Sequence, residues 1–469
     1  MFAKIQRIHF VGIGGIGMSG IAEVLLNLGY KVSGSDLKTS AVTERLHSLG
    51  AIIYEGHRAE NVAAAEVVVA SSAVAAENPE LAEARELHIP VIQRAEMLAE
   101  LMRLKYGIAI AGMHGKTTTT SMVAAVLAAG GLDPTVVVGG RVDAMGSNAR
   151  LGNSQYLVAE ADESDRSFLK LSPILAVITN IDREHMDCYR NMRDVKRAFL
   201  EFTDRVPFYG TVVACNDDRL LRGIIPQIRR RTVTYGVRRG SDFRVKPLEG
   251  SISGENHAIS RFAVTYKDQS LDEFSLNVPG LHNVLNATAA IAVGVGLGID
   301  TAQIRTALEN FRGVDRRFQL RGKVAGISVV DDYGHHPTEI HATLAAARQC
   351  KYKKIHVVFQ PHRYTRTQFL MDEFANAFGD ADSLFLLDIY PASEAPIEGI
   401  SSQVLAQKIA GHLPVAHVST FADAATSVAA IAEPGDMILT LGAGNIGQLA
   451  PMILEKLQSP VESRSVASV

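Results

Sequence analysis

Short apolar runs and longer amphipathic stretches alternate along the whole chain. β-Branched runs at Ile8–Val11, Lys31–Ser33 and Val67–Ala70 predict strands, and the stretches Ser19–Leu28 and Glu96–Lys105 predict helices. Alternation of this kind is typical of βαβ units, whose strands form parallel sheets. The pattern therefore predicts an α/β fold.

The alternation begins again twice. A fresh strand at Ile108–Ala111 opens a second series, and Ile327–Val330 opens a third. Further along we expect strands at Leu157–Ala159, Leu175–Ile178, Ile355–Phe359, Leu384–Leu387 and Met437–Leu441, a polar, strand-rich stretch over 230–278 and a helix from Asn283. A chain of 469 residues accommodates about three domains, and we predict them at 1–105, 106–320 and 321–469.

Composition narrows the classes of function. The chain is 47% apolar and 21% charged, and its net charge of −3 lacks the basic excess of a nucleic-acid binder. The longest apolar stretch, Ala287–Ile299, is too short and too rich in glycine to span a bilayer. Cys188, Cys215 and Cys350 lie too far apart for a disulfide framework or a cysteine zinc site. We therefore expect a protein of the reducing cytoplasm, without nucleic-acid partners or membrane insertion.

A first glycine turn covers Gly12–Gly17. It matches G-x-G-x-x-G directly after one predicted strand, and Asp36 closes the next strand at about the expected spacing. Glycines let the backbone approach a pyrophosphate, and the helix that follows presents amide donors to it. Taken alone, the motif indicates NAD, another phosphate-bearing ligand, or a tight turn with no ligand. We predict phosphate binding here.

A second glycine motif, which we call the phosphate loop, covers 112–118. It resembles a P-loop, although Ile110 stands where the full G-x-x-x-x-G-K-[ST] pattern has glycine. In such loops the amides surround phosphates, the lysine reaches the terminal phosphates, and the hydroxyl binds Mg²⁺. Lys116 and Thr117 are the residues that we expect to do so.

A third glycine turn, Gly442–Gly447, also matches G-x-G-x-x-G. Only 22 residues follow it, which is too few for a complete NAD half-site. The favoured interpretation is a backbone turn at the end of a sheet. Two phosphate-binding turns on separate sheets therefore indicate an ATP-using enzyme whose other substrate also carries phosphates, and they argue against a simple dehydrogenase.

Further candidates follow other strands. Glu160 follows the predicted strand Leu157–Ala159 near the phosphate loop, where a Mg²⁺ ligand is expected. The alternative for the acidic run that it opens is a solvated loop. The segment 179–187 places His185 among carboxylates, which is equally compatible with a metal ligand and with a surface turn. In 331–339 the adjacent His335 and His336 lack the spacing of a helical zinc pair, so substrate or phosphate contact is favoured.

Two arginines follow the strand that ends at Phe359. Arg363 and Arg366 are one turn apart if they are helical, and their guanidinium groups suit a carboxylate or phosphate. The alternative for this pair is a basic surface turn.

Taken together, these segments resemble the Mur ligases of bacterial peptidoglycan synthesis. The resemblance rests on HFVGIGGIGMSGIAEVL, AGMHGKTTTT, EADESD, TNIDREHMD, GLHNVLNATAA, RRFQ, DDYGHHPTE, HRYTRT and LTLGAGNIG, which occur in family order from residue 9 to 447. It implies three domains: an N-terminal Rossmann-like UDP-binding domain, a central P-loop ATPase-type domain and a C-terminal Rossmann-like domain. DDYGHHPTE and GIGGIGMSG match the branch that ligates UDP-N-acetylmuramate to L-alanine or to a recycled murein tripeptide.

The resemblance also implies roles for individual residues. In the first domain, contacts to the UDP-substrate would come from Gly14, Gly15, Ile16, Gly17, Met18, Ser19, Asp36, Ser71 and Ser72. ATP would contact Gly112, Met113, His114, Gly115, Lys116, Thr117, Thr118, Asn283, Asn286 and Arg317. One Mg²⁺ would bind Thr117 and Glu160, and a second would bind His185. The alternative for the two asparagines is a helix cap and a surface neighbour.

The third domain would complete the site when it closes about hinges near 105 and 320. Further substrate contacts are implied for His335, His336, Arg363 and Arg366, and catalytic roles for Lys116, Glu160, His185, Arg317, Asp332 and His336. The carbamoylated lysine that bridges the second metal in several Mur ligases has no counterpart in Arg197–Leu200. The resemblance implies a monomer or a weak homodimer.

The reaction implied is ATP-dependent ligation of L-alanine to the lactyl carboxylate of UDP-N-acetylmuramate. It would pass through an acyl phosphate and release ADP and phosphate. A dehydrogenase would leave the phosphate loop unexplained. A signalling ATP-binding protein would leave the first glycine turn and DDYGHHPTE without a role.

Overall fold

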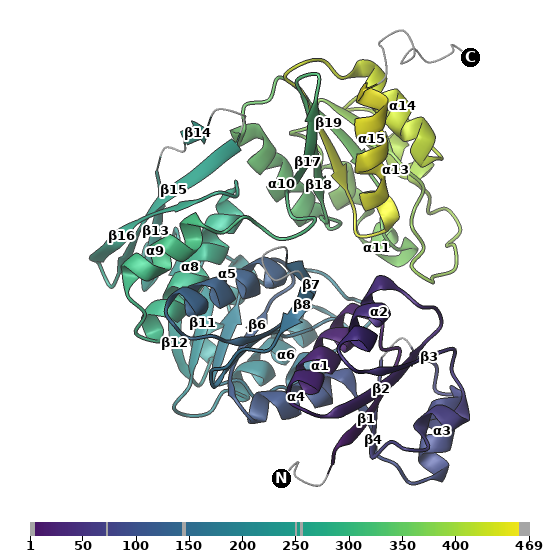
Figure 1. The fold of residues 1–469 in the computed structure, drawn as a ribbon. Helices are drawn as coiled ribbons and strands as arrows, with labels where there is room; N and C mark the ends of the chain where they lie inside the picture. Colours follow the sequence, from purple (N-terminus) through teal and green to yellow (C-terminus); the bar gives the residue numbers. More distant parts are fainter. Residues whose placement is uncertain (1–4, 72–73, 143–146, 249–250, 254–256, 459–469) are drawn as a thin grey trace. The chain divides into compact units, whose positions relative to one another are not determined.

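The computed structural model describes residues 5–71, 74–142, 147–248, 251–253 and 257–458 (Figure 1). Its packing divides the chain into two units. The first unit comprises 1–246, 263–273 and 285–308, and the second comprises 247–262, 274–284 and 309–469. The domain boundaries at 105 and 320 stay predictions.

The first unit begins with a five-stranded parallel sheet of order β3-β2-β1-β4-β5. Its strands are β1 (Arg7–Val11), β2 (Lys31–Asp36), β3 (Ile52–Glu55), β4 (Val67–Ala70) and β5 (Val91–Gln93). Its helices are α1 (Ile16–Asn27), α2 (Ala41–Ser48), η2 (Ala59–Val62), α3 (Pro79–Glu86) and α4 (Arg94–Arg103). Because β1 lies between β2 and β4, the chain order reverses at its carboxyl end. Ligands of open α/β sheets bind at such reversal points.

A second sheet in the same unit has the order β12-β11-β10-β6-β9-β7-β8, parallel except for β8. Its strands are β6 (Tyr106–Ala111), β7 (Thr135–Val142), β8 (Ser147–Arg150), β9 (Tyr156–Glu160), β10 (Leu175–Ile178), β11 (Thr211–Cys215) and β12 (Arg231–Gly236). The helices between them are α5 (Lys116–Ala129), η3 (Ser167–Lys170), α6 (Met192–Asp204), α7 (Arg219–Arg222) and η4 (Ile225–Gln227). The phosphate loop leaves β6, between β10 and β9.

The stretch that follows carries β13 (Phe243–Pro247), β14 (Ser251–Ser253), β15 (His257–Tyr266), β16 (Gln269–Leu276), α8 (Leu281–Gly296) and α9 (Thr301–Glu309). It agrees with the strand-rich region and the helix predicted there. In the described part of the chain, no helix is both long and apolar enough to cross a membrane.

The second unit contains a six-stranded sheet of order β17-β18-β22-β19-β20-β21, in which only β17 is antiparallel. The strands are β17 (Gln319–Val324), β18 (Ile327–Asp332), β19 (Ile355–Phe359), β20 (Ser383–Leu386), β21 (Val415–His417) and β22 (Met437–Leu441). The helices are α10 (Pro337–Gln349), α11 (Tyr364–Phe369), α12 (Met371–Ala375), α13 (Ser402–Ile409), α14 (Phe421–Ile431), η5 (Asn445–Gln448) and α15 (Leu449–Gln458). Two clusters of buried apolar side chains pack around this sheet.

Three helices begin earlier than the sequence predicted. Helix α1 begins at Ile16 where Ser19 was predicted, α5 at Lys116 where about Thr119 was predicted, and α8 at Leu281 where Asn283 was predicted. A glycine directly precedes each start, and Gly115 and Gly280 have φ of +81° and +101°. Since glycine adopts these values without steric cost, the chain enters each helix at once. The turns are therefore shorter than the polar pattern suggests.

Strand β2 continues past Ser33, where its apolar run ends, to Asp36, which the glycine motif placed at the end of this strand. The apolar pattern stops short because Ser35, although polar, is fully buried. Its hydroxyl donates to Glu80 Oε2 at 2.6 Å, and Glu80 at the start of α3 is also fully buried. A buried hydroxyl needs such a partner. The pair holds the end of β2 inside the fold.

Glu80 provides a test of this packing. Burial opposes its ionisation, but the nearby His9 imidazole and the hydrogen bonds from Ser35 and Asn61 outweigh burial and lower the pKa of Glu80 from 4.5 to about 2. At about 1.4 kcal/mol per pH unit, the ionised carboxylate stabilises the fold by about 3 kcal/mol above pH 4.5. Because the folded pKa is the lower one, this stabilisation disappears as the pH falls.

We therefore expect wild type and Glu80→Gln to converge in acid. The difference in their free energies of local unfolding should shrink by about 2 kcal/mol between pH 6 and pH 3. Hydrogen exchange of peptides from β1 and β2 measures this difference. Glu86→Gln, on the exposed end of the same helix, is the control and should show no such trend. A difference independent of pH would contradict the assignment.

Candidate active site

The first glycine turn lies at the carboxyl end of β1 and leads directly into α1. The amides of Gly12 and Ile13 donate to the carbonyl of Ser35 at 2.9 and 3.0 Å, and the amide of Gly14 donates to Asp36 Oδ2 at 2.8 Å. Gly15 is the N-cap of α1 in an extended conformation. The amino end of α1, with its positive dipole, therefore opens next to the turn, as an anion-binding site requires.

The residues predicted to contact the UDP-substrate do not all lie at the open end of α1. Asp36 binds the turn itself through the Gly14 amide, and Ser71 Cβ lies 3.4 Å from where a Cβ on Gly12 would stand. Met18 and Ser19 are buried, and both donate their amides to the Gly15 carbonyl within the first turn of α1. The open end of α1 is therefore formed by Gly15, Ile16 and Gly17. Ser72 lies outside the described residues.

Arg94, which the sequence analysis missed, lies against the same turn. A Cβ on Gly17 would stand 3.1 Å from the Arg94 side chain, and Arg94 Nη2 is 3.3 Å from Asp162 Oδ2. Arg94 is the first residue of α4, far from the glycine motif in sequence. Its charge therefore joins the first glycine turn to the acidic segment after β9, and only the fold reveals this.

The phosphate loop is braced by the segment that follows β10. Asn180 Oδ1 accepts the His114 amide at 2.9 Å, and Thr179 Oγ1 and Asn180 Nδ2 donate to the His114 carbonyl at 2.6 and 2.9 Å. Gly112 has φ of +131°, and a Cβ there would stand 2.1 Å from Thr179 Oγ1. Only glycine fits at this position, because the neighbouring segment occupies the space of a side chain.

Lys116 and Glu163 form a buried ion pair at the start of α5. Lys116 Nζ donates to Glu163 Oε1 at 2.7 Å and to the Gly112 carbonyl at 2.7 Å. Burial disfavours the ammonium, but the carboxylate of Glu163 outweighs it and raises the pKa of Lys116. Burial acts to raise the pKa of Glu163, and the Lys116 ammonium opposes that rise. Lys116 is therefore a fixed positive charge inside the phosphate loop.

Buried carboxylate oxygens face the same region. Among the described residues, Glu160 Oε1 and Glu163 Oε2 are buried and have no hydrogen-bond partner. Leaving such oxygens without a partner is costly, and carboxylates are the ligands that Mg²⁺ prefers. The donor set therefore fits a divalent cation. Glu163 belongs to the EADESD segment, yet its role was missed because the sequence does not show which acid turns inward.

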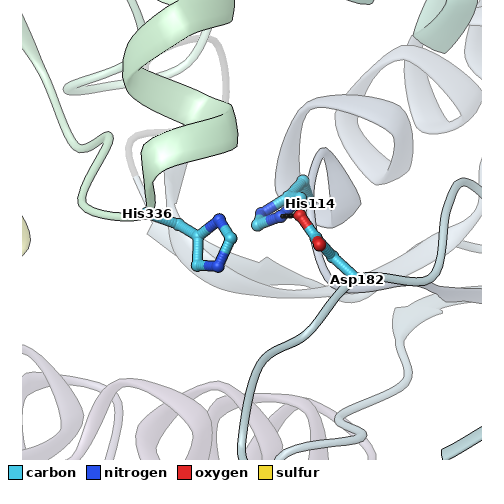
Figure 2. A group of neighbouring side chains, drawn as sticks. All are labelled: His114, Asp182 and His336. Atoms are coloured by element: carbon cyan, nitrogen blue, oxygen red, sulfur yellow. Dashed lines mark hydrogen bonds and ion pairs between the residues drawn. The ribbon is translucent and has the colours of Figure 1, made fainter. Parts of the chain in front are cut away.

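The two histidines of this region belong to different loops. His114 Nε2 lies 2.9 Å from Asp182 Oδ2, and Figure 2 shows the imidazole next to that carboxylate. His185 has φ of +56°, and its Nε2 lies 3.6 Å from Glu163 Oε1. The His185 ring therefore faces a buried carboxylate, and its role as a metal ligand stays a prediction. The third residue of Figure 2, His336, belongs to the second unit.

The two asparagines of α8 are both buried, which excludes the surface neighbour of the alternative interpretation. A Cβ on Gly115 would stand 2.8 Å from Asn286 Oδ1, so Asn286 lies against the phosphate loop within the first unit. Asn283, in the second unit, donates from Nδ2 to the Pro279 carbonyl at 2.7 Å. Asn286 thus lies beside the expected nucleotide site.

In the second unit, Arg316 holds the third glycine turn. Its guanidinium donates to the carbonyls of Gly442 and Gly444 at 2.7 and 3.2 Å, and to Asp331 Oδ2 at 2.8 Å. Arg316 itself has φ of +57°. These hydrogen bonds support the interpretation of 442–447 as a backbone turn. They assign Arg316 to that turn, in contrast to its neighbour Arg317.

Arg317 shares the Tyr333 ring with Arg316 but pairs with a different acid. Its Nη1 lies 3.7 Å from Glu339 Oε1, and its guanidinium stacks over the Tyr333 ring at 5.1 Å. Glu339 Oε2 also accepts the amides of His335 and His336 at 3.0 and 3.3 Å. Glu339, which the sequence analysis did not single out, therefore organises the start of α10.

Two titratable groups near Arg317 are Asp332, which is buried, and His282, which is half-buried. Asp332 accepts the amides of Phe318 and Gly334, each at 2.7 Å. Burial raises the pKa of Asp332 against the opposing charge of Arg317. Burial, aided by Arg317, lowers the pKa of His282 to about 4, so its imidazole is neutral near pH 7. Asp332 thus fixes the turn between β18 and α10.

Arg363 and Arg366 do not form the helical pair considered from the sequence. Arg363 precedes α11 as its N-cap, with φ of +73°, and only Arg366 lies within the helix. Arg366 Nη1 donates to the His362 carbonyl at 3.1 Å, and Arg363 Nη1 lies 4.0 Å from Glu394 Oε1. The two guanidinium groups are therefore held by different partners.

Comparison with known families accounts for most of the chain. Residues 7–106 match the model described as "Mur ligase family, catalytic domain", 110–294 match "Mur ligase middle domain", and 316–444 match "Mur ligase, glutamate ligase domain". A UDP-N-acetylmuramate–L-alanine ligase of Koribacter versatilis is 71% identical over 98% of this chain and 99% of its own length.

Solved structures of ligases are also similar to this chain. The crystal structure of the UDP-N-acetylmuramate-alanine ligase MurC of Thermotoga maritima is similar with a TM-score of 0.80 and 32% identity, over 96% of this chain and 99% of that one. The fold is also similar to that of a murein peptide ligase of Psychrobacter arcticus, with a TM-score of 0.68 and 24% identity over 97% and 99% of the two chains.

These matches confirm the resemblance inferred from the sequence and the α/β architecture of three domains. They are reached at high identity and over nearly the full length of the chain. The chain therefore belongs to the Mur ligase family.

Proposed function

We propose that the chain ligates L-alanine to the lactyl carboxylate of UDP-N-acetylmuramate and converts ATP to ADP and phosphate. The observation that carries this proposal is the pair of anion-binding turns in the first unit. One opens α1 beside Arg94, and the other opens α5 around Lys116. Two substrates that both carry phosphates need two such turns. The identity to ligases named for this reaction supports the choice of substrates.

The first step activates a carboxylate, which is a poor electrophile because its charge repels nucleophiles. The lactyl carboxylate attacks the γ-phosphate of ATP, the bond to the β-phosphate oxygen breaks, and an acyl phosphate and ADP form. Two anions meet in this step, so fixed positive charge must offset their repulsion. We assign that role to Lys116 and to Arg317. The residues of 112–118 would surround the phosphates, with Asn283 and Asn286 at the adenine.

Mg²⁺ is the cation that this donor set suits. We propose Thr117, Glu160 and His185 as ligands of two ions, and add Glu163 because its Oε2 is buried without a partner among the described residues. When bound, the ions would neutralise charge on the phosphates.

In the second step the amine of L-alanine attacks the acyl phosphate. A tetrahedral intermediate forms and collapses with loss of phosphate, leaving an amide bond. His185 and His336 are the candidates for accepting the amine proton. We further propose that His335, Arg363 and Arg366 contact substrate and that Asp332 positions its turn. The reaction is expected in the cytoplasm, with the chain acting as a monomer or weak homodimer.

Phosphate release tests the reaction and the amino donor together. With ATP and UDP-N-acetylmuramate present, L-alanine should release phosphate faster than glycine, L-serine or murein tripeptide. A coupled phosphate assay measures this order. Faster release with the tripeptide would indicate a recycling ligase. No release that depends on any amino donor would reject the ligase, and reduction of NAD by a substrate would indicate a dehydrogenase.

Lys116→Ala should reduce turnover by about a thousandfold or more, because it removes the fixed charge at the phosphates. Binding of UDP-N-acetylmuramate, measured by calorimetry, should persist and shows that the variant is folded. Lys456→Ala, at an exposed position of α15, is the matched control. Near-normal turnover of Lys116→Ala would remove the basis for the ATP site.

Substitution of Arg316 should lower stability, whereas substitution of Arg317 should lower activity. Arg316→Lys loses the fork that holds the third glycine turn and should destabilise β22 and η5 by about 2 kcal/mol, as measured by hydrogen exchange. Arg317→Lys should leave that exchange unchanged and lower kcat. If both variants behaved alike, the assignment of Arg317 to ATP would lose its support.

A further inference from the structure

A polar cluster lies buried beneath the carboxyl end of β2, and none of its side chains has a role in the proposed reaction. Its centre is Glu80, whose side chain is fully buried, as are those of Ser35 and His9. A buried carboxylate costs folding free energy unless its oxygens are well bonded, and an apolar side chain of similar size is usually no worse for stability. Its presence therefore calls for another reason.

Both oxygens of Glu80 have defined partners. Oε2 accepts the Ser35 hydroxyl at 2.6 Å and lies 3.2 Å from His57 Nδ1, and Oε1 accepts Asn61 Nδ2 at 2.5 Å. His57 Nδ1 is also 2.9 Å from Ser35 Oγ, and His9 Nε2 is 3.7 Å from Glu80 Oε1. The carboxylate thus fixes the rotamer of Ser35 from one side while the sheet fixes its backbone.

Ser35 in turn holds the first glycine turn. Its carbonyl accepts the amides of both Gly12 and Ile13, and the next residue, Asp36, accepts the amide of Gly14. Three consecutive amides of the turn are therefore bound by two consecutive residues of β2. The approach is close, since a Cβ on Gly34 would stand 2.5 Å from Ile13 Cδ1. A small shift of β2 would be transmitted directly to the turn.

We propose that Glu80 is a positioning residue for the nucleotide-sugar substrate, which acts through Ser35 to hold the first glycine turn in the geometry that binds the diphosphate. Glu80 touches no substrate atom in this role. The inference rests on the proposed function, because it takes the turn to be the UDP-binding one. It extends that function by assigning the affinity for the UDP group to a residue 45 positions from Ser35 along the chain.

The test compares binding of UDP with binding of ADP by calorimetry on the full chain. Glu80→Gln keeps an acceptor for Asn61 but places an amide where Ser35 donates, so the dissociation constant for UDP should rise about tenfold or more. That for ADP should change less than twofold, because the phosphate loop lies on another sheet. In turnover, KM for UDP-N-acetylmuramate should rise with kcat nearly unchanged.

Two serine variants separate positioning from general stability. Ser35→Ala removes the same hydrogen bond from its other end and should weaken UDP binding to a similar extent. Ser33→Ala removes the hydrogen bond of His9 Nδ1 at 2.9 Å in the same cluster, without touching the turn. It should leave UDP affinity within twofold. The double variant of Glu80 and Ser35 should bind UDP no more weakly than the weaker single variant, since both lose one shared interaction.

Each outcome decides one point. If wild type bound no UDP, the proposed function itself would fail. If wild type bound UDP and Glu80→Gln bound it equally well, the positioning role would be overturned. Should Glu80→Gln fail to bind ADP because it does not fold, Ser35→Ala decides, and unchanged UDP affinity in that variant would overturn the proposal. Equal loss in Ser33→Ala would indicate a general stabilising role and would also overturn it.

Discussion

The close approach of neighbouring backbone segments at the carboxyl ends of parallel strands is the constraint on which this structure depends. At Gly112 the space of a side chain is taken by Thr179, and at Gly442 a Cβ would stand 2.8 Å from the Gln360 carbonyl. Both glycines also have positive φ. Since no other residue fits at either position without strain, each strand passes into its turn with amides exposed at one edge of a sheet.

Charged side chains are paired near these turns. The net charge of the chain is small, and the cationic groups of the expected sites are held locally by acids. Lys116 pairs with Glu163, Arg94 with Asp162, Arg316 with Asp331 and Arg317 with Glu339. A long cationic side chain that is held by an acid loses less rotamer freedom when an anionic ligand arrives. The acids are therefore part of the positioning of these cations.

The sequence predicted much of the fold because its signals are local. The strands that the apolar runs predicted are all present, with ends shifted by at most three residues. Helix starts were placed too late wherever a glycine stood directly before them, because glycine carries no pattern of its own. The apolar run stopped short of the end of β2, because a buried serine looks like a surface residue until its partner, Glu80, is known. Only the spacing of Asp36 from the first glycine turn indicated that end.

The sequence by itself determined the family, the succession of the three sheets along the chain and the positions of the glycine turns. It could do so because strands, turns and helix ends are encoded within a few residues of one another. Only the tertiary structure decided which acids turn inward. These acids are Glu163, which lies beside Lys116, Glu339, which lies beside Arg317, and Glu80, which lies beneath Ser35. These partners are separated by tens of residues, and the free energy of burying a charge depends on neighbours that the fold alone brings together.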